Sequence, residues 1–105
     1  MIKDLYNTGK TVVSLEIFPP KKGQGTLESI TGKLEEFSTL SPDFISVTYG
    51  AGGSTTGSTC DIATLVRQEY GIESLAHLTC LTATRDEVAS TLDRLRDGGV
   101  ENTLA

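Results

Sequence analysis

The sequence predicts an α/β domain with a parallel sheet, and three observations lead to this fold class. Short apolar runs that favour strands alternate with longer segments whose apolar residues recur at helical spacing. The interval is constant, since 31 residues separate Leu15 from Ser46 and 31 more separate Ser46 from His77. A βαβ unit takes about 30 residues. This alternation therefore indicates parallel strands joined by helical crossovers.

The composition excludes several classes of function. The 105 residues carry a net charge of −5, so we expect one small domain that binds neither nucleic acid nor an anionic membrane surface. No apolar run reaches the roughly 20 residues of a membrane span, and Glu16 interrupts the first one. We therefore expect a cytoplasmic protein. Cys60 and Cys80 are expected to be buried and reduced, with no metal site, and a disulfide between them is the less favoured alternative.

The first third of the chain predicts a short helix, a strand and a long helix. Met1–Asn7 can form one amphipathic turn, which Gly9 ends. A buried strand is expected within Val12–Pro20, because its β-branched residues favour a pleated backbone and its two prolines end the ladder. From Thr26 the spacing becomes helical, and Ser41–Asp43 ends that helix. Its apolar face consists of Leu27, Ile30, Leu34 and Phe37.

The second strand and the second long helix follow directly. Residues 44–48 form a short apolar run and are predicted to be a strand. A helix is expected over residues 58–70, with Ser58 or Thr59 as its N-cap, because a hydroxyl there can accept from a free backbone N–H. Gly71 is expected at the C′ position, where glycine tolerates a left-handed backbone.

The same pattern occurs a third time and then begins again. Residues 74–79 are predicted to be the third strand. Thr84 and Glu87 are spaced as a capping box, in which each side chain satisfies a free backbone N–H at a helix start. That helix ends at Gly98-Gly99, and a fourth strand begins within Val100–Ala105. Its apolar stripe consists of Val88, Leu92 and Leu95.

Residue parity separates two architectures, a doubly wound open sheet and a (β/α)₈ barrel. Each predicted strand is apolar on one face and polar on the other toward its C-terminal end. Central strands of a doubly wound sheet are apolar on both faces, whereas a barrel lines its mouth with polar strand ends. Parity therefore favours the barrel. The polar positions are Ser14, Glu16, Ser46, Thr48, His77 and Thr79.

The length of the chain limits this interpretation. A closed (β/α)₈ barrel takes about 250 residues, so residues 1–105 account for the N-terminal portion, about three and a half βα units of a TIM barrel. The sequence stops within the expected fourth strand. Such a piece would leave a sheet edge and the barrel interior open. We therefore interpret it as an incomplete barrel domain, truncated in strand four.

Three polar residues at equivalent strand ends are the candidate site. Glu16 is the candidate general acid or base, and Thr48 and His77 would hold a ligand. The alternative is a structural polar cluster. His77 is the only histidine, so neither a His-based metal site nor a Ser-His-Asp triad can be assembled. The glycine-rich segment Tyr49–Gly57 does not match a dinucleotide-binding fingerprint, because Thr55 stands where its third glycine belongs.

Four segments, taken together and in this order, resemble the N-terminal part of the methylenetetrahydrofolate reductase family. They span nearly the whole chain, and the set is specific although each segment alone is not. The segments are Ser14–Lys21, Pro42–Ser54, Ala76–Cys80 and Gly99–Asn102.

The resemblance implies an oxidoreductase of one-carbon metabolism. Members of this family are (β/α)₈ barrels that bind FAD, take hydride from NADH or NADPH and reduce 5,10-methylenetetrahydrofolate to 5-methyltetrahydrofolate. By motif position, Glu16 matches the acid that protonates the folate and opens its five-membered ring. Thr48 and Tyr49 match positions near the flavin and nicotinamide, and His77 matches a flavin contact. The segment that lines the nicotinamide side contains Phe18, Pro19, Pro20 and Lys21.

Some positions depart from the family pattern. Ile17 stands where phenylalanine is usual, and Thr56–Ser58 replaces a more charged helix start. The family's Arg-Gly-Asp segment would begin just after Ala105. Alternatives therefore stay open, namely an inert truncated remnant, a partial subunit that completes its barrel with a partner chain, or a small open α/β binding module unrelated to folate. The choice of nicotinamide and a possible homo-oligomer are also open.

Overall fold

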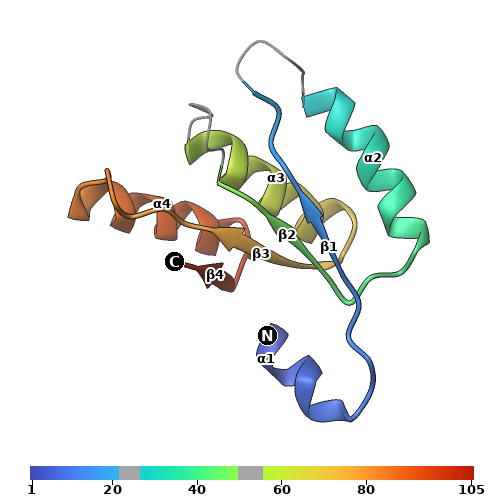
Figure 1. The fold of residues 1–105 in the computed structure, drawn as a ribbon. Helices are drawn as coiled ribbons and strands as arrows, with labels where there is room; N and C mark the ends of the chain where they lie inside the picture. The colour runs from blue at the N-terminus through green and yellow to red at the C-terminus, as the bar shows by residue number, and fades with distance from the viewer. Residues whose placement is uncertain (22–26, 50–55) are drawn as a thin grey trace.

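In the computed structural model the chain forms a four-stranded parallel sheet with helices packed against it (Figure 1). The structure describes residues 1–21, 27–49 and 56–105, so most of the predicted glycine-rich loop lies outside the described residues. The strand order follows the chain, as expected for successive βαβ units. The strands are β1 (Ser14–Ile17), β2 (Phe44–Val47), β3 (Glu73–His77) and β4 (Asn102–Leu104).

One long helix lies in each crossover between strands, which confirms the predicted α/β alternation. The three are α2 (Leu27–Thr39), α3 (Thr56–Glu69) and α4 (Arg85–Asp97). A short helix α1 (Ile2–Leu5) and a 3₁₀ turn η1 (Tyr6–Thr8) precede β1. As expected, Gly9 ends that turn in the left-handed region at φ 71°. None of these described helices is long and apolar enough to cross a membrane.

The core lies between one face of the sheet and the three long helices, which lie on the same side of the strands (Figure 1). Ile17 pairs with Val47, and Val47 pairs with Ala76, so these three apolar positions share a face. The predicted parity of the three strands is therefore confirmed. The buried core residues are Ile17, Ile45, Val47 and Ala76 from the strand side, with Ile30, Leu34, Ile62, Ala63, Val66 and Leu95 from the helices.

The expectation that β1 is buried was wrong. β1 pairs only with β2, so it is an edge strand, and its residues Ser14 and Glu16 are exposed. Val13 belongs to the segment in which the buried strand was predicted, yet it precedes β1 and is 53% exposed. An edge strand has one neighbour instead of two, which leaves its free face and its outer edge open to solvent.

The predicted cap of the second long helix was also wrong. α3 begins at Thr56, so Ser58 and Thr59 lie inside its first turn. The Thr59 hydroxyl instead donates to the backbone carbonyl of Thr48 at 3.1 Å, which ties α3 to the end of β2. At the other end of α3, Gly71 adopts the expected left-handed conformation at φ 64°.

Two further burial predictions need correction. Leu92 is 41% exposed, and Thr91 is buried in its place on α4. The Thr91 hydroxyl donates to the Glu87 carbonyl, which allows a polar side chain to face inward.

Cys60 is buried as expected, but Cys80 is exposed, and both are free thiols. Burial raises the pKa of the Cys60 thiol, an effect that the nearby Arg94 guanidinium opposes.

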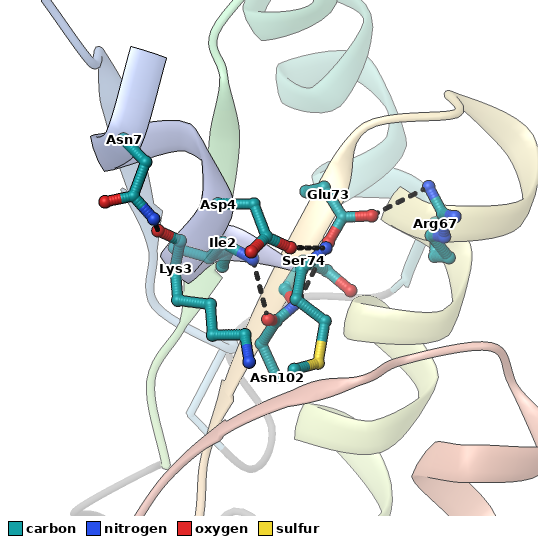
Figure 2. Close-up of polar contacts among 9 residues, drawn as sticks. Ile2, Lys3, Asp4, Asn7, Arg67, Glu73, Ser74 and Asn102 are labelled. Carbon is teal, nitrogen blue, oxygen red and sulfur yellow. Dashed lines mark hydrogen bonds and ion pairs between the residues drawn. The ribbon is translucent and has the colours of Figure 1, made fainter. Parts of the chain in front are cut away.

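The side-chain amide of Asn102 joins the N-terminus to the beginning of the sheet (Figure 2). Its Oδ1 accepts from the Ile2 N–H at 3.0 Å, and its Nδ2 donates to Glu73 Oε2 at 2.9 Å and to the Ser74 carbonyl at 3.2 Å. Arg67 Nη1 lies 3.1 Å from the other Glu73 oxygen. One amide therefore connects α1, β3 and β4, and through Glu73 also α3.

Replacing Asn102 with Ala should destabilise the protein by about 1–3 kcal/mol, because partly buried hydrogen-bonding groups lose their partner. Urea unfolding measures this free energy. Asn7→Ala is the matched control, since the Asn7 amide is exposed and makes one long contact of 3.4 Å to the Lys3 carbonyl. Equal stability of the Asn102 variant and the control would contradict this role.

The capping box at the start of α4 predicts a pH dependence of stability. Thr84 and Glu87 bond each other's backbone N–H as expected, and the hydrogen bonds from Thr84 lower the pKa of the Glu87 carboxyl. A carboxyl group whose pKa is lower in the folded than in the unfolded state stabilises the folded state at any pH above the unfolded-state pKa. This stabilisation is lost as the pH falls through the folded-state pKa. Below about pH 4.3, the usual pKa of a glutamate carboxyl, the melting temperature should therefore fall more for the wild type than for Glu87→Gln. Parallel pH curves would contradict the prediction, and Glu101→Gln, an exposed residue before β4, is the control.

Candidate functional site

The open face of the sheet brings together three polar side chains from three neighbouring strands. The Glu16 carboxylate of β1 accepts from the Ser46 hydroxyl of β2 at 3.3 Å. The same oxygen, Oε1, lies 3.8 Å from His77 Nε2 of β3. The Glu16 side chain therefore points toward His77, across the sheet face that the described helices do not cover. The predicted proximity of Glu16 and His77 is present in the structure.

The strand register explains why these groups meet. Glu16 pairs with Ser46, and Ser46 pairs with Leu75, so their side chains lie in one row across the sheet. His77 lies on the same face, two residues beyond Leu75 toward the C-terminal end. The short Ser46 side chain contacts Glu16, which lies directly opposite it on the neighbouring strand. The longer Glu16 side chain extends diagonally across the sheet to the His77 imidazole.

Burial differs among the three groups and determines what each can do. Ser46 is 8% exposed and fixed in the sheet. The side chains of Glu16 and His77 are 46% and 26% exposed. At 3.8 Å the imidazole and carboxylate are too far apart for a hydrogen bond, and they attract each other as charges only when the imidazole is protonated. The carboxylate can therefore meet a ligand while one of its oxygens contacts the protein.

Thr48, which follows β2, is the third predicted strand-end residue. Its backbone N–H donates to the Ile17 carbonyl at 2.9 Å, which extends the pairing of β1 with β2. The side chain is buried, and its Oγ1 has no hydrogen-bond partner within the described part of the chain. A buried hydroxyl without a partner is unfavourable. Thr48 therefore has hydrogen-bonding capacity to offer at the C-terminal end of the sheet.

Among the described residues, two hollows lie next to the C-terminal ends of the strands. One, of about 430 Å³, is bounded by Glu16 and all four predicted residues of the following segment, together with α2. Within that segment Phe18 is 71% exposed and Pro19 is buried. Two lysines, Lys21 and Lys33, are among the residues that line this hollow. Its lining comprises Glu16, Ile17, Phe18, Pro19, Pro20, Lys21, Ser29, Ile30, Lys33 and Phe37.

Tyr49 belongs to the other hollow, of about 500 Å³, at the beginning of α4. It shares that space with Leu78, Thr79 and residues of α4 such as Asp86 and Arg94. Strand alternation puts Tyr49 on the side of Val47, away from the row that contains Glu16. The structure therefore groups Glu16 with His77, and it separates Tyr49 from them.

Ser46 is the contact that the sequence analysis did not assign to the site. Parity identified its polar side, but only the register shows that it stands directly opposite Glu16. In the described ranges no group of three or more His, Cys, Asp or Glu residues is arranged to hold a metal ion. The carboxylate, hydroxyl and imidazole on this face can form hydrogen bonds and transfer protons.

Comparison with known proteins identifies the family. The family model described as methylenetetrahydrofolate reductase matches residues 1–105. The chain belongs to the methylenetetrahydrofolate reductase family. The resemblance seen in the four sequence segments is thereby confirmed.

Several curated members of the methylenetetrahydrofolate reductase family are similar to this chain. "Methylenetetrahydrofolate reductase (NADH) 1" of Arabidopsis thaliana is 34% identical over 104 residues, which are 99% of this chain and 17% of the relative. The "5,10-methylenetetrahydrofolate reductase" of Salmonella typhimurium is 32% identical over 97 residues, which are 92% of this chain and 32% of the relative. The chain thus spans less than a third of the length of either relative.

Proposed function

We propose that this chain is part of a flavin-dependent reductase that converts 5,10-methylenetetrahydrofolate to 5-methyltetrahydrofolate with NADH or NADPH. Membership of the family supports the reaction class. The observation that carries the proposal is the position of Glu16, whose carboxylate lies on the open sheet face, 3.8 Å from His77. An acid so placed is available to a substrate bound at the strand ends.

We further propose that residues 1–105 are the first strands and helices of a (β/α)₈ barrel. Consecutive parallel strands with helices on one face are what an arc of such a barrel requires. Both β1 and β4 are edges of the described sheet, and closure of a barrel removes such edges. The open polar face would then line the interior and mouth of the barrel, which is where active sites of this architecture form.

The residues at the strand ends fit a bound FAD. Thr48 has a buried hydroxyl without a partner in the described ranges, and His77 has a partly exposed ring. These two residues would hold the flavin on the open face of the sheet. The family resemblance also implies Tyr49, but Tyr49 lines the separate hollow at the beginning of α4, so we do not include it in this flavin site. When bound, the flavin supplies the acceptor and donor of hydride. The chain's own contribution is to bind it and to place an acid beside the folate.

Glu16 is the proposed acid. Its carboxyl would transfer a proton to a ring nitrogen of the folate, and the adjacent carbon–nitrogen bond of the five-membered ring would then break. The leaving nitrogen takes the proton, so the carboxyl becomes a carboxylate. General acid catalysis by one side chain contributes about 10²–10⁴-fold in rate. The side chain is 46% exposed, so it can regain a proton from solvent.

The hollow between β1 and α2 is the proposed nicotinamide side. Phe18, Pro19 and Pro20 supply an apolar wall. The amines of Lys21 and Lys33 are suited to an anionic group such as a phosphate. This part of the proposal rests on the lining residues and on the family resemblance of the segment.

Glu16→Gln in the complete flavin-loaded protein should leave flavin binding and its reduction by NADH or NADPH intact, and should slow folate reduction by about 10² or more. The amide keeps the size of the side chain but cannot donate a carboxyl proton. Stopped-flow absorbance of the flavin follows each half-reaction separately. Glu101→Gln, at an exposed position before β4, is the control.

Two outcomes would count against the proposed function. Unchanged folate reduction in the Glu16 variant would remove this residue from the acid role. A wild-type protein that neither binds flavin nor reduces the folate would favour the inert alternative.

A further inference from the structure

We propose that Ser46 is a positioning residue that holds Oε1 of Glu16, so that Oε2 is the oxygen that transfers the proton. This inference rests on the proposed function, because it specifies how the acid of that reaction is oriented. It starts from the one direct hydrogen bond that the described residues make to the Glu16 carboxylate.

The Ser46 hydroxyl has two acceptors within reach. Its Oγ lies 3.3 Å from Glu16 Oε1 and 3.4 Å from the Leu15 carbonyl oxygen. A hydroxyl has one proton to donate, and the Glu16 oxygen is the nearer of the two acceptors. Both distances are long for an O–H···O bond, and catalytic hydrogen bonds commonly shorten when the substrate is bound.

The surroundings of the carboxyl group distinguish its two oxygens. Ser46 and His77 Nε2 both approach Oε1, at 3.3 and 3.8 Å. Within residues 1–21, 27–49 and 56–105, no hydrogen bond or ion pair to Oε2 is present. In a neutral carboxyl group one oxygen accepts and the other carries the proton. The hydrogen bond from Ser46 to Oε1 therefore favours the proton on Oε2.

Burial makes Ser46 suited to this task. Its side chain sits within β2, between two neighbouring strands, and is 8% exposed, whereas the Glu16 side chain is 46% exposed. A flexible acid at an open face has several rotamers, and misplacement by about 1 Å can cost about 10² in rate. A fixed hydroxyl opposite the carboxylate limits those rotamers before the substrate arrives.

The test uses three variants of the complete flavin-loaded enzyme. Ser46→Ala removes the hydroxyl, Ser46→Thr retains it, and Ser14→Ala removes an exposed hydroxyl from the same sheet face without touching the carboxylate. Both half-reactions are followed by stopped-flow. We expect Ser46→Ala to slow the folate half-reaction by about 10- to 100-fold, with little change in flavin reduction by NADH or NADPH. Ser46→Thr and Ser14→Ala should stay within about threefold of the wild type.

The outcomes separate this inference from the proposed function. If Glu16→Gln slows the folate half-reaction and Ser46→Ala does not, the positioning role is wrong and the acid role stands. If neither variant slows it, both the acid role of Glu16 and the positioning role of Ser46 are wrong, whereas the proposed function as a reductase fails only if the wild type does not reduce the folate. If Ser46→Ala slows both half-reactions equally and Ser46→Thr does not restore the rates, Ser46 has only a structural role and the positioning role is wrong. Should Ser46→Ala fail to bind flavin, Ser46→Cys keeps the side-chain size, weakens the donor and is judged by the same criteria.

Discussion

The parallel pairing of β1 with β2 is the constraint on which the site depends. It is fixed at both ends, since the Asp43 N–H donates to the Val13 carbonyl at 2.8 Å and the Thr48 N–H donates to the Ile17 carbonyl at 2.9 Å. A shift of one residue would turn Glu16 toward the helices and Ile17 toward solvent. Burial of Ile17 in the core therefore supports the register that brings Glu16 to the open face.

The two ends of the sheet have different roles. At the N-terminal ends of the strands, Asn102 uses its amide to connect α1, β3 and β4 (Figure 2). At the C-terminal ends, Thr48 has an unpartnered buried hydroxyl within the described residues, and Glu16 and His77 are partly exposed. This division is typical of α/β barrels, in which one end of the strands provides stability and the other provides chemistry.

Much of this arrangement could be predicted from the sequence, because it depends on local chemistry. The alternation of strands and helices, the capping box at Thr84 and the face on which Glu16 lies all follow from spacing and parity. The contact between Ser46 and Glu16 could not be predicted, because it depends on the register between two strands that are distant in sequence. The exposure of Val13 was mispredicted for a related reason, since a sequence does not say which strand lies at an edge.

A crystal structure of the complete protein with bound flavin tests the central claim most directly. The claim is that the sheet face with Glu16, Ser46 and His77 is the catalytic face of a reductase. We expect the flavin ring on that face, near His77, with Ser46 in contact with the Glu16 carboxyl and a free carboxyl oxygen directed toward the folate site. A flavin bound on the helix-covered side, for example in the hollow between Tyr49 and α4, would contradict the account.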